Sequence, residues 1–185
     1  MLFSRLSLFC LVSSVLATPA PPPATQKVSV TETIKTISNK INKLDVALKQ
    51  RPGSGSPDTA RSITQNLLTL SKDSIAESKK GARYIREGSL ITYAESLVVG
   101  TLLTSMQMTL TSTTKGWIDS KRMVVAAGMQ QDVLNTLYDA SDATNLFADT
   151  LISKMPMGTG TVGLFTKEQF VRIIEPGITE YLKNN

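Results

Sequence analysis

The sequence predicts an all-α protein, an antiparallel bundle of four long helices with a shorter C-terminal helix, about five in total. Apolar residues recur every three or four positions over long segments, which is the period of a helix that buries one side. No segment alternates apolar and polar residues with period two, and no Asn-Gly or Asp-Gly turn occurs, so no sheet is expected. The loops between the helical segments are short, which favours antiparallel neighbours.

The first two helices are separated by a Pro/Gly/Ser segment at residues 51–55. Before it, one apolar stripe contains Val30, Ile34, Ile37, Ile41, Leu44 and Leu48. After it, Ser56 is expected to cap a second helix with Pro57 at the first helical position. This helix carries Ser74 and Ser78 on its apolar stripe, and Gly88 is expected to end it.

The third helix is expected to begin with Thr92-Tyr93-Ala94-Glu95, which has the spacing of a capping box. Residues 96–114 carry no charge but contain many Ser and Thr residues, so they are too polar for a lipid-embedded span. Because charge is also missing, we expect this helix at the centre of the bundle.

Two further helices are predicted after residue 130. A stripe of apolar and small residues, including Val133, Leu137, Phe147 and Leu151, predicts a long fourth helix that Pro156 ends. The last helix is expected to open at Thr166, with Gln169 completing a second capping box. The Pro-Gly pair at residues 176–177 is expected to interrupt it near its end.

The N-terminus has the pattern of a secretory signal peptide. Arg5 precedes an apolar segment at residues 6–16, and small residues allow cleavage after Ala17 or after Ala20. We expect residues 1–17 as signal peptide, residues 18–28 as a Pro-rich linker and residues 29–185 as one helical domain. Cys10, the only cysteine, lies in the signal peptide, so no disulfide is expected in the exported protein.

Composition excludes much catalytic and metal chemistry. The chain has no histidine, which removes Ser-His-Asp triads and most zinc sites, and we expect no cofactor and no metal. Asp139 and Asp142 could form a carboxylate pair for hydrolysis, but such pairs are common on exposed helix surfaces. A Gly-rich run at residues 158–163 has dinucleotide-loop spacing without a preceding strand, which indicates a plain connection.

The charge of the chain is mildly basic, with a formal value of +5. Its densest basic cluster contains Lys79, Lys80, Arg83 and Arg86, without the interleaved aromatic residues of a nucleic-acid groove. No nucleic-acid partner is expected. A solvated helix side and a patch for an acidic partner or anionic surface stay open as alternatives.

The helix interior is the candidate site. Small residues and flexible methionines leave room between helices and adapt to apolar shapes. The predicted lining of an apolar cavity is Leu103, Met106, Leu110, Met129, Leu137, Phe147 and Leu151. A hydroxyl of Thr104, Ser105 or Tyr138 is expected to orient a lipid head group. The alternative is that the small residues only let the helices approach closely.

Several segments resemble the fungal hydrophobic surface binding protein family, which includes lipid-binding domains of cell-wall galactomannoproteins. They are the Ile34-Ile37-Ile41-Leu44 stripe, the Thr92-Tyr93-Ala94-Glu95-Ser96-Leu97 helix start, the positions Gly128, Val133 and Leu137, and the closing Lys154-Met155-Pro156. The resemblance implies a secreted, non-catalytic bundle that adsorbs to hydrophobic surfaces and helps recruit a polyester hydrolase, or encloses a fatty acid. The Ser/Thr-rich tail of some wall-bound members is missing here, which favours free secretion.

These observations favour a secreted, extracellular protein that binds a long-chain fatty acid, another lipid or a hydrophobic surface. Association with the cell wall remains an alternative location. A surface-adsorbing adaptor for another secreted protein and a carboxylate-based hydrolase are the alternative functions. No transmembrane segment is expected, and a homodimer remains open because amphipathic helices can also bury their stripes across two subunits.

Overall fold

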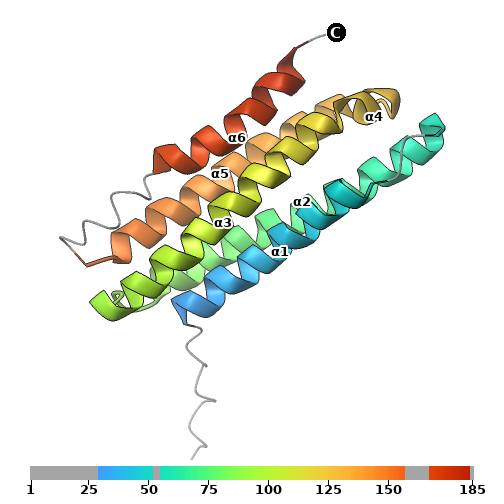
Figure 1. Ribbon diagram of the computed structural model, residues 1–185. Helices are drawn as coiled ribbons and strands as arrows, with labels where there is room; N and C mark the ends of the chain where they lie inside the picture. Colours follow the sequence, from blue (N-terminus) through green and yellow to red (C-terminus); the bar gives the residue numbers. More distant parts are fainter. Residues whose placement is uncertain (1–28, 52–54, 157–166, 184–185) are drawn as a thin grey trace, which may run out of the picture.

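Every regular element of the described chain is a helix. The computed structural model describes residues 29–51, 55–156 and 167–183, and in these ranges no strand occurs, which confirms the predicted all-α bundle (Figure 1). The elements are α1 (Val30–Gln50), α2 (Pro57–Glu87), α3 (Tyr93–Asp119), α4 (Lys121–Ala126), α5 (Gln130–Lys154) and α6 (Lys167–Leu182). The expected signal peptide, its linker and the Gly-rich run lie outside the described residues.

The predicted helix starts of α2 and α3 are confirmed. The backbone N–H of Thr59 donates to Ser56 Oγ at 3.2 Å, with Pro57 at the first turn. In the capping box before α3, the N–H of Glu95 donates to Thr92 Oγ1 at 3.3 Å and the N–H of Thr92 donates to the Glu95 carboxylate at 2.9 Å. The expected capping box of α6 includes Thr166, which lies outside the described residues.

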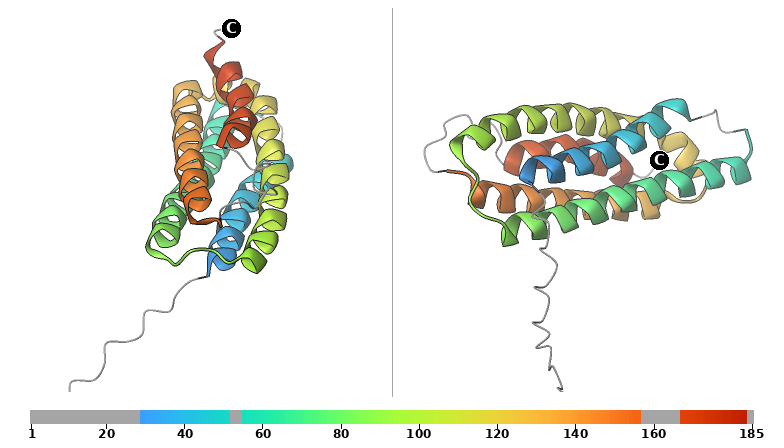
Figure 2. Two further views of the ribbon diagram at one scale, coloured as in Figure 1. Left: turned by 90° about the vertical axis from the view of Figure 1, so that its left-hand side faces the viewer. Right: turned by 90° about the horizontal axis from the view of Figure 1, so that it is seen from below.

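The five long helices form a closed ring around the core. Following the contacts, the order around the ring is α1, α2, α5, α6, α3 and back to α1, as the end view of Figure 2 shows. Each helix therefore buries one side toward the interior and has two helical neighbours. A side that points away from the ring faces solvent.

The directions of the neighbours differ from the predicted antiparallel packing. α1 and α2 are antiparallel, since a Cβ on Gly81 would meet Ile37 and Thr33. However, α3 lies parallel to α1, because Gly116 approaches Leu48 near the ends of both helices. The reason is the connection after α2, which crosses the end of the bundle and buries Ile91 there.

The described residues form six helices rather than about five, because a short helix lies between α3 and α5. At Ser120 the side chain donates to the Gly116 carbonyl at 2.6 Å and the backbone N–H donates to the Trp117 carbonyl at 3.0 Å, which tightens the last turn of α3. The short α4 follows. It ends at Ala126, and the turn that follows contains Gly128, whose φ of 68° is unfavourable for residues with a Cβ.

The expectation that α3 lies at the centre of the bundle is wrong. Val99, Leu103 and Met106 are buried, whereas Leu97 and Met108 on the opposite side are exposed. With α3 in a ring of five helices, only one of its sides can face the interior. The missing charge therefore does not reflect complete burial.

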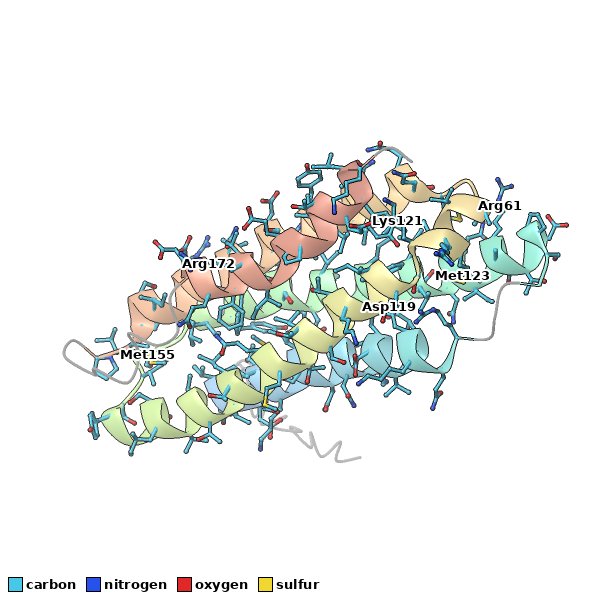
Figure 3. All side chains as sticks on the ribbon, turned by 45° about the horizontal axis from the view of Figure 1, so that its top comes forward. Arg61, Asp119, Lys121, Met123, Met155 and Arg172 are labelled. Atoms are coloured by element: carbon cyan, nitrogen blue, oxygen red, sulfur yellow. The ribbon has the colours of Figure 1, made fainter. Side chains whose placement is uncertain are left out.

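The interruption predicted at Pro176 is also wrong, because α6 continues through this residue to Leu182. Pro176 lacks an N–H, but tertiary contacts hold the last turns of the helix. Lys121 of α4 donates to the Glu180 carbonyl at 2.8 Å and to the Lys183 carbonyl at 3.1 Å. Figure 3 shows Lys121 close to the end of α6.

The core consists of two clusters along the ring. One contains Ile34, Leu103 and Phe147 near the start of α3, and the other contains Leu48, Trp117 and Leu137 near its end. Among the described residues, no helix has the length and apolar character needed to cross a membrane.

Candidate functional site

A central cavity lies where all five long helices meet, with a volume of about 40 Å³. Its apolar walls include Leu110 and Trp117 of α3, Leu137 of α5 and Ile174 of α6. The complete lining is Ile41, Leu44, Ser71, Ser74, Leu110, Thr113, Thr114, Trp117, Thr136, Leu137, Ala140 and Ile174. No charged side chain is in this lining, so the cavity suits an apolar molecule with few polar atoms.

Hydroxyl groups form one part of the central cavity wall. Ser74 donates to the Ser71 carbonyl at 2.8 Å, Thr113 donates to the Thr109 carbonyl at 2.9 Å and Thr136 donates to the Asp132 carbonyl at 2.8 Å. These protons are used inside their own helices. Ser71 Oγ differs, because it is buried without a hydrogen-bond partner among the described residues.

A buried hydroxyl without a partner costs free energy, about 1–3 kcal/mol for an unsatisfied polar group. Ser71 is only 3% exposed, so bulk water does not reach it. Its position in the cavity lining means that a ligand oxygen could accept its proton.

A second, end cavity of about 10 Å³ lies toward the start of α3 and the end of α5. Leu103, Phe147, Leu151 and Phe170 form its walls, together with Ala148, Ile152 and Met155. Every lining side chain is apolar. Figure 3 shows Met155 at this end of the bundle, with Arg61 and Lys121 at the other.

The two cavities lie along one line in the bundle interior. On α3 their linings extend from Leu103 to Trp117, which corresponds to about 21 Å of helix. Met106 lies between them on the buried side of α3, and it is 2% exposed. Because a methionine side chain is flexible, it can change rotamer more easily than a branched residue.

The structure brings together five of the ten predicted site residues. Leu103, Phe147 and Leu151 line the end cavity, and Leu110 and Leu137 line the central cavity. Met106 is in the core between them without lining either cavity. Met129 is half-buried at the start of α5 and packs against the cluster around Trp117, away from both cavities.

The three predicted hydroxyl residues do not reach the cavities. Thr104 and Ser105 are exposed on the outward side of α3, where Thr104 donates to the Gly100 carbonyl at 3.1 Å. Tyr138 is 45% exposed on α5. The prediction for Thr104 and Ser105 agrees with the expectation that α3 lies at the centre of the bundle, which is wrong.

The buried hydroxyls of the central cavity were missed as site residues. Ser74 and Ser78 stand on the predicted apolar stripe of α2, which was the available signal for polar groups inside the bundle. Ser71 is part of the same buried side. Thr113, Thr114 and Thr136 are at the interior side of α3 and α5, where sequence alone does not distinguish them from the exposed threonines.

Charged groups lie away from both cavities. Asp139 and Asp142 are exposed on α5 and line neither cavity. Within the described residues, no cluster of three His, Cys, Asp or Glu residues could hold a metal ion. The pKa of Glu180 is lowered by hydrogen bonds from Lys183 and then from Lys121. These contacts hold the end of α6, and Glu180 lines neither cavity.

Sequence comparison agrees with this architecture. The profile of the family described as Hydrophobic surface binding protein A matches residues 28–153, which include α1 to α5 except the last residue of α5. The chain belongs to the hydrophobic surface binding protein A family. No curated protein sequence matches it significantly.

Several solved structures with the same fold are of proteins in complex with fatty acids. Ligand binding domain 2 of Penicillium marneffei MP1, complexed with multiple arachidonic acids, is 18% identical, with a TM-score of 0.72 over 83% of this chain and 94% of that one. Domain 1 of MP1, complexed with arachidonic acids, is 15% identical, with a TM-score of 0.74 over 85% and 100%.

Afmp4p in complex with palmitic acid is 15% identical to this member of the hydrophobic surface binding protein A family. Its TM-score is 0.71, over 84% of this chain and 99% of that one. At these identities the likeness shows a common fold. The fatty acids are ligands of those proteins, as their structures show.

Proposed function

We propose that this chain binds a long-chain fatty acid or a similar lipid between its helices. The observation that carries the proposal is the central cavity, which has apolar side chains from α1, α3, α5 and α6 and, on α2, one buried hydroxyl, Ser71, without a partner in the described chain. The fatty acids bound by MP1 and Afmp4p, which share the fold, support this ligand class.

Binding of such a ligand requires the helices to separate. A dry cavity of about 150 Å³ accommodates benzene, whereas the central cavity is only about 40 Å³. Joining the two cavities by a rotamer change of Met106, with an outward shift of α6, would give an elongated space. Its length along α3, about 21 Å, suits an extended acyl chain better than a compact ligand.

The energetics allow this rearrangement. Each buried methylene contributes roughly 0.8 kcal/mol, so ten of them contribute about 8 kcal/mol. That amount corresponds to about micromolar affinity before the cost of separating the helices is subtracted. Longer chains, which bury more methylenes, are therefore expected to bind more tightly than shorter ones.

Trp117 offers a direct test, because it is the only tryptophan of the chain and lines the central cavity. Titration with palmitic acid should change its fluorescence, and fatty acids brominated on the chain should quench it. Native mass spectrometry of the purified protein should show bound lipid. Unchanged Trp117 fluorescence together with no bound lipid at micromolar concentrations would refute the proposal.

We further propose export from the cell by the signal peptide expected at residues 1–17. The intact mass of the protein from culture medium should match cleavage after Ala17 or after Ala20. Retention of the full-length chain inside the cell would contradict export. Fractionation of the cell wall would show whether part of the protein stays there.

The proposed function includes no catalytic step. Because Asp139 and Asp142 are exposed and line neither cavity, replacing both by asparagine should leave lipid binding unchanged. A hydrolytic activity that disappears in this variant would instead support the carboxylate-based hydrolase.

A further inference from the structure

The walls of both cavities carry no charge. The central cavity is lined by apolar residues, serines and threonines, and the end cavity is lined by apolar residues alone. Two charged residues of the described chain are buried, Asp45 and Lys121, and neither of them lines a cavity. A ligand head group in the bundle interior would therefore meet no cation among the described residues.

The two buried charged residues are engaged outside the cavities. Lys121 Nζ donates to the Glu180 carbonyl at 2.8 Å, at the end of α6. Asp45 follows Leu44, which lines the central cavity, but the Asp45 carboxylate accepts from Lys49 Nζ at 2.6 Å. An acidic side chain at this position on α1 gives an anionic ligand no compensation for its charge.

The hydroxyl groups of the central cavity offer one donor and several acceptors. Ser74, Thr113 and Thr136 donate their protons to carbonyl groups of their own helices. A hydroxyl oxygen keeps its lone pairs when it donates, so these three oxygens can still accept a hydrogen bond. Ser71 differs, because its hydroxyl has no partner in the described chain and its proton can be donated to a ligand. The wall therefore matches a ligand group that both accepts and donates.

An ionised carboxylate is a poor match for this wall. It only accepts hydrogen bonds, with about four lone-pair sites on its two oxygens, whereas Ser71 is the one hydroxyl described above whose proton has no acceptor. Burying an unpaired charge also costs far more free energy than burying a neutral polar group. Because burial disfavours the charged form, an acid in this cavity should keep its proton. A protonated carboxyl or an alcohol has an O–H and an acceptor oxygen.

We propose that the central cavity selects lipids with an uncharged head group that carries an O–H, either a long-chain alcohol or the protonated form of a fatty acid. This inference rests on the proposed lipid binding and specifies the ligand class of the same site. Ser71 donates to the oxygen of the head group, and the O–H of the head group donates to one of the three acceptor hydroxyls. A fatty acid that is ionised in solution takes up one proton from water when it binds.

Dodecanol and dodecanoic acid test this proposal, because they have the same chain length and different head groups. A carboxyl group in water has a pKa of about 4–5. The affinity for dodecanoic acid, measured by titration calorimetry, should fall by about tenfold for each pH unit from pH 6 to pH 8, as the neutral form becomes rarer. The affinity for dodecanol should not change over this range, which controls for effects of pH on the protein. Affinities for the acid and the alcohol that are equal and independent of pH would overturn the proposal.

A second measurement counts the protons directly. Titration with dodecanoic acid at pH 7 in two buffers of different ionisation enthalpy gives the number of protons taken up for each ligand bound. We expect about one proton for the acid and none for dodecanol, because only the acid is ionised in solution at this pH. Binding of the acid without proton uptake would overturn the proposal, since the carboxylate itself would then be the bound form.

The ether 1-methoxydodecane separates the O–H group from the charge, because it is uncharged but cannot donate. It should bind about fivefold more weakly than dodecanol, which corresponds to the loss of one hydrogen bond. Equal affinities for the ether and the alcohol would overturn the proposed role of the O–H.

A head group at the protein surface is the arrangement that would contradict the buried one. Arg172 is exposed on α6 (Figure 3) and is a cation that a surface carboxylate could contact. We expect Arg172→Gln to bind dodecanoic acid at pH 8 as wild type does, and a weaker affinity for the acid but not for dodecanol would overturn the proposal. Absence of binding for every one of these ligands would refute the proposed lipid binding itself. Tight binding of the ionised acid would refute only the present inference.

Discussion

Tyr181 donates its hydroxyl proton to the carbonyl oxygen of Trp117 at 2.9 Å, across 64 residues of sequence. The bond joins the last turn of α6 to the last turn of α3, and Tyr181 is 1% exposed. Burial raises the pKa of Tyr181 above its usual value, so the hydroxyl stays protonated and remains a donor. The C-terminal half of α6 is thereby held to the ring beside the central cavity, which Trp117 lines.

Replacing Tyr181 by phenylalanine should lower stability by about 1 kcal/mol, the usual net contribution of one hydrogen bond. The Trp117 carbonyl keeps its bond from the Ser120 N–H, so it would not be left unpaired. For a chain of this size the midpoint of thermal unfolding should fall by about 2–4 °C. Tyr138→Phe is the control, because Tyr138 is 45% exposed. An equal change in both variants would contradict the role of the bond.

The ion pairs of Glu180 should make stability depend on pH. Hydrogen bonds from Lys183 and then Lys121 lower the pKa of Glu180 in the folded state. Its contribution is therefore complete above the usual pKa of glutamate, about 4.3, and is lost as pH falls through the lowered folded-state value. The melting temperature of wild type should exceed that of Glu180→Gln at pH 7, and the difference should shrink as the pH falls below about 4.3 and through the lowered folded-state pKa.

Glu175→Gln is the control for this prediction, because Glu175 is exposed on the same helix. The melting temperature of Glu175→Gln should be close to that of wild type at pH 7 and at pH 3. If the melting temperatures of wild type and Glu180→Gln differ by the same amount from pH 7 to pH 3, the shape of the Glu180 side chain rather than its charge stabilises α6.

Local sequence was sufficient to predict the five long helices and two of their starts, but not the short α4. The periods of apolar residues indicate α1, α2 and α5, and the capping box and uncharged run indicate α3. The caps at Ser56 and Thr92 use hydrogen bonds within four residues. Such contacts join residues that are close in the sequence, so they can be predicted from it. The continuation of α6 through Pro176 was not predicted, because it depends on Tyr181 and Lys121 contacting distant parts of the chain.

The order of helices and the buried side of α3 could not be predicted from local sequence. In α1, lysines mark the solvent side, whereas α3 has no charge between Glu95 and Lys115 to mark either side. Thr104, which is exposed, and Thr113, which is buried, are therefore equivalent in sequence. α3 packs parallel to α1 because the connection after α2 crosses the end of the bundle. The length of this connection in the sequence does not show that it crosses.

The close packing of α3 on α1 can be tested at Gly116. A Cβ at this position would lie 2.9 Å from Leu48 Cβ, which is too close without a shift of the two helices. We expect Gly116→Ala to lower stability by about 1–3 kcal/mol, as overpacking usually does, although alanine favours the helix itself. Gly55→Ala is the control, because nothing lies within 4 Å of its Cβ position. Urea unfolding of both variants measures the difference.

The unpartnered hydroxyl of Ser71 leads to opposite expectations for stability and for binding. Without lipid, Ser71→Ala should be neutral or slightly stabilising, because it removes a buried polar group that has no partner in the described chain. With lipid, the same change should weaken binding by about five- to tenfold, which corresponds to about 1 kcal/mol for one lost hydrogen bond. Thermal unfolding and Trp117 quenching measure the two effects.

Ser78→Ala is the matched control for Ser71. Ser78 is buried on the same side of α2 but donates to the Ser74 carbonyl at 2.9 Å and lines neither cavity. Its replacement should therefore leave lipid affinity unchanged and should not stabilise the protein. If Ser71→Ala binds palmitic acid as well as wild type does, the head group lies elsewhere, and the central cavity would then accept only the acyl chain.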